Sequence, residues 1–425
     1  MQIAILGRQP KISLAELEAL FGHSRVKQIN EFAATVDTHK PLPQKKLGGT
    51  IKSANLLITI KSTDLSAVFG ELESLILKLQ ADLQVGKLQF GVSIYGFEAK
   101  RDWLLKKMLA LKKVIKTAGR SVRIIENKFE ELEAAQVLYN KLTGPLGIEI
   151  LIIKDGKTTI IAQTTGVQDI DAYSERDFGR PKRDSYVGML PPKLAQILLN
   201  LAIQQNNETS NINQESKTCD SLLSTHNPRG PVVLDPFCGT GVVLQEALLM
   251  GYDAYGTDIS QRMIEYSQVN LEWLNGKWKM ENGKWKVEVG DATKHIWDFS
   301  EIAGSGSRIF VVCETYLGKP LTTLPSKDQL QIIINEANQI TQEFLKNLAP
   351  QIKTGTHLCV ALPAWVVGSD FKYGNNQQFK HLPVLDHLVK LGYNRLDFVH
   401  AKNSELIYHR SDQIVARELT VLEKI

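Results

Sequence analysis

The sequence predicts an α/β protein in which an N-terminal α+β part precedes a doubly wound parallel sheet. The chain has 425 residues, which is too long for one ordinary domain. Short strands and amphipathic helices fill residues 1–168 in mixed order, as in small split βαβ units. From Pro231 onward strand and helix patterns alternate, which favours a parallel sheet with helices on both faces.

The elements expected in the N-terminal part are short. Apolar residues at helical spacing predict its helices, and β-branched or alternating runs predict its strands. Asp155-Gly156 separates two strand-like runs and predicts a tight hairpin turn. We expect strands at 1–7, 54–60, 88–96, 121–125, 148–154 and 157–165, and helices at 13–22, 64–83, 102–118 and 130–142.

The C-terminal part follows a charged segment, 169–187, which has little periodicity and is expected to be a linker. Pro191-Pro192 precede a helical pattern, because proline is tolerated in the first turn of a helix. The Asn/Ser-rich residues 204–230 predict an exposed loop. We then expect strands at 232–235, 254–258, 286–291, 309–314 and 357–363, helices at 193–203, 242–251, 262–274 and 329–348, and an antiparallel pair, 395–402 with 405–422, that closes the sheet.

The composition is that of an ordinary globular protein. Hydrophobic residues make up 43% and charged residues 23%, which excludes a disordered, collagen-like or disulfide-scaffold chain. Apolar stretches are interrupted by charges well before the roughly 18 residues of a membrane span. The first residues lack the basic and then apolar pattern of a signal peptide.

Cysteine and histidine usage predicts no metal site. The four cysteines, Cys219, Cys238, Cys313 and Cys359, form no C-x-x-C motif, so neither a zinc site nor a disulfide framework is expected. The nine histidines form no H-E-x-x-H or similar set of ligands. We therefore expect a reduced, cytoplasmic protein without a bound metal.

The positive charge is concentrated in the N-terminal part. The formal net charge is +4. Residues 1–170 carry 24 Lys and Arg against 17 Asp and Glu, whereas the rest of the chain carries 26 against 29. This modest positive field favours an anionic partner near the N-terminal part.

A glycine-rich turn after the strand at 232–235 is the most informative motif. The run Asp-Pro-Phe-Cys-Gly-Thr-Gly, 235–241, joins that strand to a helix, and glycine lets a ligand approach the backbone closely. Asp258 lies 17 residues past Gly241 at the end of the next strand, where a carboxylate can accept hydrogen bonds from ribose hydroxyls. A dinucleotide fingerprint would have glycine in place of Leu244. Asp235 would also repel a pyrophosphate, whereas it would attract the cationic methionine portion of S-adenosylmethionine.

Two further acids follow strands of the same expected sheet. Asp291 follows the third strand, where it could accept from an adenine amino group, although a lone aspartate there is often a helix cap. Glu314 ends the fourth strand and precedes Thr315 and Tyr316. Ligands bind at the carboxyl ends of strands in open α/β sheets, so this group is a candidate site unless Glu314 is merely a strand-end acid.

The motifs at 235–241, 176–184 (RDFGRPKRD), 188–195 (GMLPPKLA) and 408–418 (YHRSDQIVARE) together resemble those of the THUMP-domain methyltransferases. The resemblance covers nearly the whole chain and is strongest to the tRNA guanosine-N2 methyltransferases that act at position 10. It implies a Rossmann-like methyltransferase domain at 188–425 with S-adenosylmethionine as the methyl donor. It also implies a ferredoxin-like domain at 1–85, an RNA-binding THUMP domain at 86–168 and a linker at 169–187.

The resemblance assigns roles to the acids and glycines of the C-terminal half. Asp235, Gly239 and Gly241 would cradle the methionine portion of the donor. Asp258 would bind its ribose and Asp291 its adenine. The residues expected to bind the donor, with their neighbours, are Asp235, Phe237, Gly239, Gly241, Asp258, Ile259, Asp291 and Ala292.

The fourth motif departs from the family pattern. Relatives that methylate exocyclic amines usually carry D-P-P-Y, whereas this chain has Glu314, Thr315 and Tyr316 followed by Leu-Gly. An exocyclic amine is a poor nucleophile, and acceptors for its N–H groups favour a reactive nitrogen. Glu314 and the Thr315 carbonyl could supply these acceptors, and Tyr316 could stack on an extruded base. A DNA amino-methyltransferase stays open as an alternative because D-P-P-Y-type sites also serve DNA bases. An inactive RNA-binding protein stays open because the fourth motif is altered.

A lysine-rich helix is the main candidate for contact with RNA. Apolar residues at 104, 108, 111 and 115 have helical spacing, so the lysines between them project elsewhere. Such a face is often only solvated, but a local excess of this size favours contact with phosphates. The residues expected to bind RNA are Lys106, Lys107, Lys113, Arg120, Arg123 and Arg180.

Overall fold

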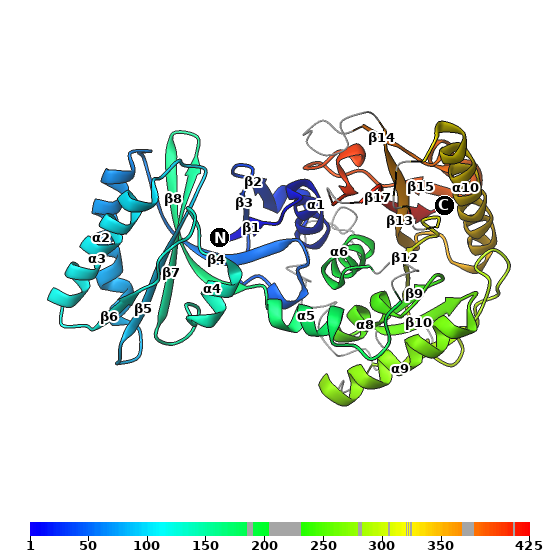
Figure 1. Cartoon of the computed structure of the whole chain (residues 1–425), viewed down its shortest axis with the longest axis horizontal. Coiled ribbons are helices and arrows are strands. Elements are labelled where there is room, and N and C mark those ends of the chain that lie inside the picture. The colour runs from blue at the N-terminus through cyan, green and yellow to red at the C-terminus, as the bar shows by residue number, and fades with distance from the viewer. Residues whose placement is uncertain are drawn as a thin grey trace, which may run out of the picture. The chain divides into compact units, whose positions relative to one another are not determined.

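In the computed structural model of the chain, two compact units are seen (Figure 1). Unit 1 comprises Met1–Leu17 and His23–Ala172, and unit 2 comprises Glu18–Gly22 and Tyr173–Ile425. The structure describes residues 1–184, 190–203, 231–278, 283–304, 307–319, 321, 323, 325–367, 378–410 and 413–425. The expected polar loop at 204–230 and the end of the expected linker therefore lie outside the described residues.

Unit 1 is built on one eight-stranded sheet with the order β2-β3-β1-β4-β8-β7-β5-β6. Strand β5, next to the edge strand β6, is parallel to β7 and β6, and the other pairs are antiparallel. The expected hairpin turn is confirmed between β7 and β8, where Gly156 has a φ of 56°. The strands are β1 (Gln2–Leu6), β2 (Val26–Gln28), β3 (Ala33–Val36), β4 (Thr50–Ile60), β5 (Leu88–Tyr95), β6 (Val122–Ile124), β7 (Gly147–Asp155) and β8 (Thr158–Val167).

Two helices lie side by side against the sheet of unit 1, as Figure 1 shows for α2 and α3. The helices of this unit are α2 (Leu65–Ala81), α3 (Arg101–Thr117), α4 (Ala134–Tyr139) and the part of α1 (Pro10–Phe21) that precedes Glu18. The expected apolar face of α3 is confirmed, since its residues 104, 108, 111 and 115 are buried. They share one core with α2 residues such as Leu72 and with β5 residues such as Phe90. Both this core and the β4–β8 strand pair therefore cross the boundary that we expected at residue 85.

A buried ion pair joins the strands of unit 1. Lys52 on β4 places its Nζ 2.5 Å from Oε1 of Glu149 on β7, and the two residues are 1% and 0% exposed. Lys52 also donates to the Leu132 carbonyl at 2.7 Å. The Ser93 and Thr164 hydroxyls donate to the two carboxylate oxygens of Glu149 at 2.6 and 2.7 Å. Each strand of the sheet centre thus supplies one partner, which makes the network sensitive to strand register.

We predict that Lys52→Met destabilises the protein by about 3–5 kcal/mol, because it leaves Glu149 buried without its counter-ion. The double variant Lys52→Met/Glu149→Leu should recover much of that loss, since it removes both charges. Urea unfolding followed by circular dichroism measures the difference, with Lys61→Met on the surface as the control. A single variant as stable as the wild type would contradict this account.

Unit 2 contains a doubly wound sheet with the order β11-β10-β9-β12-β13-β17-β15. Strands β11, β10, β9, β12 and β13 are parallel. The long β17 is antiparallel to both β13 and β15, so the expected parallel sheet and the closing strand within 405–422 are confirmed, whereas the strand expected at 395–402 is wrong beyond residue 395. The strands are β9 (Val232–Asp235), β10 (Asp253–Asp258), β11 (Trp285–Val289), β12 (Ile309–Glu314), β13 (His357–Val367), β14 (Gln378–Lys380), β15 (Tyr393–Arg395), β16 (Ile407–Tyr408) and β17 (Val415–Lys424).

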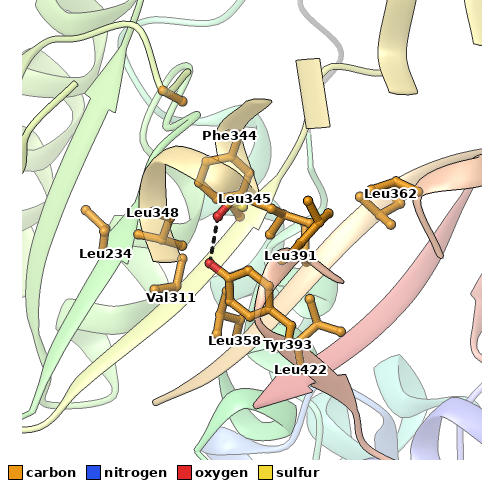
Figure 2. Close-up of a cluster of buried hydrophobic side chains, with 14 of the residues drawn as sticks. Leu234, Val311, Phe344, Leu345, Leu348, Leu358, Leu362, Leu391, Tyr393 and Leu422 are labelled. Atoms are coloured by element: carbon orange, nitrogen blue, oxygen red, sulfur yellow. Dashed lines mark hydrogen bonds between the residues drawn. The ribbon is translucent and has the colours of Figure 1, made fainter. Parts of the chain in front are cut away.

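Helices cover this sheet, and one of them carries much of its core. The α-helices are α5 (Ile170–Phe178), α6 (Pro192–Ala202), α8 (Val242–Leu249), α9 (Gln261–Trp278) and α10 (Lys327–Leu348). Figure 2 shows Phe344, Leu345 and Leu348 of α10 packed with strand residues such as Leu358. The Tyr393 hydroxyl donates to the Leu345 carbonyl at 2.9 Å, so its one polar atom is satisfied in this core. Helix α5 occupies part of the segment that we expected to be a linker.

Candidate active site

A cavity of about 700 Å³ opens at the point where the strand order of unit 2 reverses. The first strand, β9, pairs in parallel with β10 on one side and with β12 on the other. The carboxyl ends of these strands therefore meet at one crevice, which is where open α/β sheets bind ligands. The expected site residues that line the cavity are Asp235, Phe237, Gly239, Asp258, Ile259, Asp291, Ala292, Glu314, Thr315 and Tyr316.

The glycine turn has a conformation that favours glycine at two positions. Gly239 and Gly241 have φ values of 50° and 84°, in the left-handed region. A Cβ on Gly241 would approach the Ser267 Oγ to 2.9 Å, and that hydroxyl donates to the Gly239 carbonyl at 2.8 Å. Gly241 is not among the residues that line the cavity. It shapes the turn and its packing on α9, whereas Gly239 borders the cavity.

A third glycine of the site was not singled out from the sequence. A Cβ on Gly256 of β10 would approach Cδ1 of Leu244 to 2.5 Å and Cβ of Cys238 to 3.0 Å. The bare backbone of Gly256 therefore lets the glycine turn and α8 lie directly on β10. The sequence does contain a signal for this close approach, because a glycine in the middle of an apolar strand often marks a place where another backbone lies close.

Asp258 supports the glycine turn as well as lining the cavity. Its Oδ2 accepts from the Gly239 amide at 3.0 Å, and its Oδ1 accepts from the Ser260 amide at 2.8 Å. Burial raises the pKa of this carboxyl, and the two amides lower it. A carboxylate oxygen can accept more than one hydrogen bond, so Asp258 retains capacity for two neighbouring hydroxyls of a ligand.

Asp235 is the most strongly buried acid of the cavity. It is 2% exposed, and its Oδ1 accepts from the Phe237 amide at 3.1 Å. Burial raises the pKa of this carboxyl well above its usual range, and the nearby carboxylates of Asp258 and Glu314 raise it further. A cationic group bound beside Asp235 would offset this repulsion, which makes the cavity selective for positive ligands.

Asp291 both caps a turn and borders the cavity. Its Oδ1 accepts from the Thr293 hydroxyl at 2.7 Å and from the Thr293 amide at 3.0 Å, and its Oδ2 lies 3.2 Å from the Lys294 Nζ. The hydrogen bond from the Thr293 hydroxyl is the main cause that lowers the pKa of this carboxyl. No helix follows Asp291 before β12 within the described residues, so it caps a turn and not the helix that we left open, and it also lines the cavity.

Apolar surface stands beside these acids. Ile259 is 72% exposed although it follows a buried strand, and it lines the cavity. A flat aromatic ligand could cover such a side chain. Phe237 instead packs its ring edge-on against Phe344 of α10, with 5.1 Å between ring centroids. Ala292 is buried in the core, so both residues shape the wall mainly through packing.

The group at the end of β12 has a partner that we did not predict. Oε1 of Glu314 accepts from Nε of Arg417 at 2.6 Å. The Thr315 amide donates to the Ala361 carbonyl at 3.1 Å, while its buried hydroxyl makes no hydrogen bond within the described part of the chain. Burial raises the pKa of Tyr316, and Glu336 of α10 raises it further. Arg417 lies in the run 408–418, and only its place in that motif could have indicated a role.

The cysteines near the cavity are packing residues. Cys238, Cys313 and Cys359 are free and buried. Burial raises the pKa of each thiol, and a protonated thiol is a weak nucleophile.

Among the residues that the structure describes, no group of His, Cys, Asp and Glu could hold a metal ion. Across the same residues, no helix has the length and apolar character needed to span a membrane.

The residues expected to contact RNA fall into two groups. Lys106, Lys113 and Arg123 are exposed on unit 1, and Lys107 lies with its Nζ 5.4 Å from the centre of the Trp103 ring. The structure gives the other two predicted residues, Arg120 and Arg180, partners within the protein.

Arg120 and Arg180 serve the fold. Arg120 donates to the carbonyls of Gln80, Gln84 and Gly86, which lie at and beyond the end of α2. Arg180 is 3% exposed and donates to Oε1 of Gln245 at 3.3 Å. Burial lowers the pKa of Arg180 to about 10. Its burial argues against the contact with RNA that we expected.

Arg123 borders a basic hollow on unit 1. The hollow measures about 540 Å³ and also contains Lys87 and Lys141. The Tyr139 side chain, 85% exposed, lines it as well. Cations beside an exposed aromatic ring suit a nucleic acid, because phosphates bind the cations and a base can stack on the ring. The sequence did not reveal this hollow because its cations come from separate segments.

Comparisons with known proteins give a family model and named relatives. A model described as DNA methylase matches residues 178–269. The tRNA (guanine(10)-N2)-dimethyltransferase of Pyrococcus abyssi is 28% identical over 247 residues, 56% of this chain and 64% of that protein. The protein of the same name from Methanothermobacter thermautotrophicus is 37% identical over 87 residues, 20% of this chain and 19% of that protein. The chain thus covers less than two thirds of these relatives.

A solved structure also aligns along the chain. TrmN from Thermus thermophilus matches 100% of this chain and 99% of its own length, with 14% identity and a TM-score of 0.49.

Proposed function

We propose that this protein transfers a methyl group from S-adenosylmethionine to the exocyclic N2 of a guanosine in tRNA, at position 10. One observation carries the proposal. A single cavity brings Asp235, Asp258 and Asp291 together with the group that begins at Glu314. The curated relatives named tRNA (guanine(10)-N2)-dimethyltransferase support the nucleotide and its position. A cytoplasmic location belongs to the same proposal.

The acids of β9, β10 and the turn after β11 suit the donor. When bound, S-adenosylmethionine would supply an electrophilic methyl group on a cationic sulfur. Asp235 would face the positively charged methionine portion, which offsets the repulsion among the buried carboxylates. Asp258 would accept from the ribose hydroxyls and Asp291 from the adenine amino group. The exposed Ile259 would then cover one face of the adenine ring.

The end of β12 suits the base that accepts the methyl group. Glu314 and the Thr315 carbonyl would accept hydrogen bonds from the exocyclic amine and hold its nitrogen in line with the methyl group. Tyr316 lines the same cavity and would stack on a base extruded from the RNA. The attacking amine would become positively charged as its bond to the methyl carbon forms and the bond from that carbon to sulfur breaks, which leaves S-adenosylhomocysteine. The Glu314 carboxylate would stabilise that charge and accept the proton, which would then pass to water.

Unit 1 would hold the tRNA. Its basic hollow and the exposed lysines of α3 provide cations for phosphates, and Tyr139 provides a ring for stacking. Phosphate contacts fix position and contribute little sequence information. Unit 1 would therefore supply affinity, whereas the cavity of unit 2 would select the base.

Two variants should separate donor binding from methyl transfer. Asp258→Ala should abolish binding of S-adenosylhomocysteine in calorimetry, because it removes the ribose acceptor and the support of the Gly239 amide. Glu314→Gln should leave that binding intact and lower transfer of tritiated methyl to tRNA by about 100-fold. Thermal unfolding shows whether both variants fold. Unchanged affinity of Asp258→Ala, or full activity of Glu314→Gln, would refute the assignment.

Donor binding should strengthen as the pH rises. Because the pKa of Asp235 is raised, part of this carboxyl is protonated at lower pH, and a cationic ligand binds only its ionised form. Affinity for S-adenosylhomocysteine, whose ammonium group is cationic, should therefore increase as the pH rises, by at most ~10-fold per pH unit. Calorimetry in two buffers measures the accompanying proton release.

The Asp235→Asn variant isolates this effect. It should bind more weakly and release fewer protons, whereas Asp298→Asn, a carboxyl outside the cavity, should behave as the wild type. Equal proton release by wild type and Asp235→Asn would rule out a titrating Asp235 in donor binding.

Charge reversal in the basic hollow should weaken tRNA binding. Arg123→Glu and Lys87→Glu should each raise the dissociation constant by about 10-fold. Each should also reduce the slope of the logarithm of the dissociation constant against the logarithm of salt concentration by about one. Lys157→Glu at the β7–β8 turn makes the same change of charge and serves as the control. Filter binding at several salt concentrations measures the effect. If the control weakens binding as much as the hollow variants, the hollow is not the RNA site.

DNA is the second candidate substrate because the matching family model is described as DNA methylase. Tritium incorporation into tRNA and into DNA, compared under the same conditions, distinguishes the two. Mass spectrometry of nucleosides from the treated tRNA then identifies the modified base. Tight tRNA binding without any transfer would instead support an inactive RNA-binding protein.

A further inference from the structure

The ion pair between Glu314 and Arg417 points to a role that the proposed function does not include. We propose that Arg417 is a positioning residue that fixes the Glu314 carboxylate for the exocyclic amine. The inference rests on the proposed function. Arg417 is absent from the residues that line the cavity, so it would act only through Glu314.

The strand register brings the two side chains together. Glu314 on β12 lies opposite Ala361 on β13, and Ala361 lies opposite Leu419 on β17. Arg417 is two residues from Leu419 and therefore points to the same face of the sheet. Its side chain crosses β13 to reach Glu314. The β13 residue opposite Arg417 is Pro363.

The surroundings make the pair rigid. Arg417 is 5% exposed, and its NH1 also donates to Oε1 of Gln413 at 3.2 Å, which anchors the guanidinium at its other end. The Nε–Oε1 distance of 2.6 Å is that of a short charge-assisted hydrogen bond. Within the described residues, Glu314 makes no other side-chain hydrogen bond. One carboxylate oxygen is therefore occupied by Arg417, and the other remains for a ligand.

This contact explains how a glutamate can serve where relatives usually have aspartate. Glutamate has one more rotatable bond, so an unsupported carboxylate would sample several positions. Misplacement of a reacting group by about 1 Å can lower a rate by about 100-fold. Arg417 selects one position, and it also offsets part of the repulsion that Asp235 experiences from Glu314. Loss of Arg417 should therefore lower turnover more than it lowers donor affinity.

The test is a double-mutant cycle in the full-length protein. Arg417→Met removes the charge but keeps the length, Arg417→Lys keeps the charge, and both are made in the wild-type and Glu314→Gln backgrounds. The kcat and the KM for tRNA are measured by tritium transfer, and affinity for S-adenosylhomocysteine by calorimetry. Arg395→Met breaks the neighbouring pair with Glu418, whose NH2–Oε1 distance is 2.9 Å, and serves as the matched control.

We expect Arg417→Met to lower kcat by about 10–100-fold, with a much smaller fall in affinity for S-adenosylhomocysteine. Arg417→Lys should restore part of kcat, and Arg395→Met should leave it unchanged. In the Glu314→Gln background, Arg417→Met should cause no further loss, because the two residues act as one unit. If Arg417→Met does not fold, Arg417→Lys in both backgrounds completes the cycle.

Three results would overturn the inference. The first is a wild-type kcat in Arg417→Met. The second is a fall in kcat caused by Arg417→Met that is as large in the Glu314→Gln background as in the wild type. The third is a fall in donor affinity that matches the fall in kcat. A wild-type product other than N2-methylguanosine would overturn only the proposed substrate, because the cycle is scored by total tritium. A wild-type protein that transfers no methyl group would overturn the proposed function and the role of Arg417 together.

Discussion

The crevice of unit 2 depends on holding several carboxylates close together in a partly buried place. Mutual repulsion and loss of hydration both oppose this arrangement. The structure compensates each acid locally. Backbone amides of Gly239 and Ser260 donate to Asp258, and Thr293 donates to Asp291. Arg417 compensates Glu314 with a full positive charge. These contacts determine the shape of the glycine turn and the wall formed by β12.

Compensation is least complete at Asp235. It receives one amide hydrogen bond, from Phe237, and the raised pKa of its carboxyl reflects the burial and the neighbouring charges that remain. A protein that binds no ligand would gain stability from a neutral residue at this position. The retained strain is typical of a functional site, where the ligand supplies the missing charge. The same residue thus marks both a weak point of the fold and the position where the proposed donor would place its positive charge.

The sequence predicted those parts of the site that depend on local pattern. Asp235, Asp258 and Glu314 each end an apolar strand, and the carboxyl ends of neighbouring parallel strands must meet at one edge of the sheet. The alternation of strand and helix was therefore enough to bring them together. The apolar face of α3 was predicted for the same reason, because helical spacing determines which residues are buried.

Contacts between distant segments could not be predicted from one sequence. Arg417 is 103 residues from Glu314, Lys52 is 97 from Glu149, and Arg180 is 65 from Gln245. No periodicity links such positions, and a charged residue in a polar run gives no indication that it will be buried. Arg180 was therefore expected on the surface, and Arg417 was not considered.

The same limit applies to judging a departure from a motif. From the local sequence alone, Glu314 without a following proline suggests a fourth motif that has lost its rigidity. Arg417 supplies from β17 a constraint that the local sequence lacks. The Thr315 amide adds another by donating to the Ala361 carbonyl of β13. Whether an altered motif remains competent is thus decided by the strands packed beside it. Here β13, which pairs with β12, and β17, which pairs with β13, hold the altered residues in place.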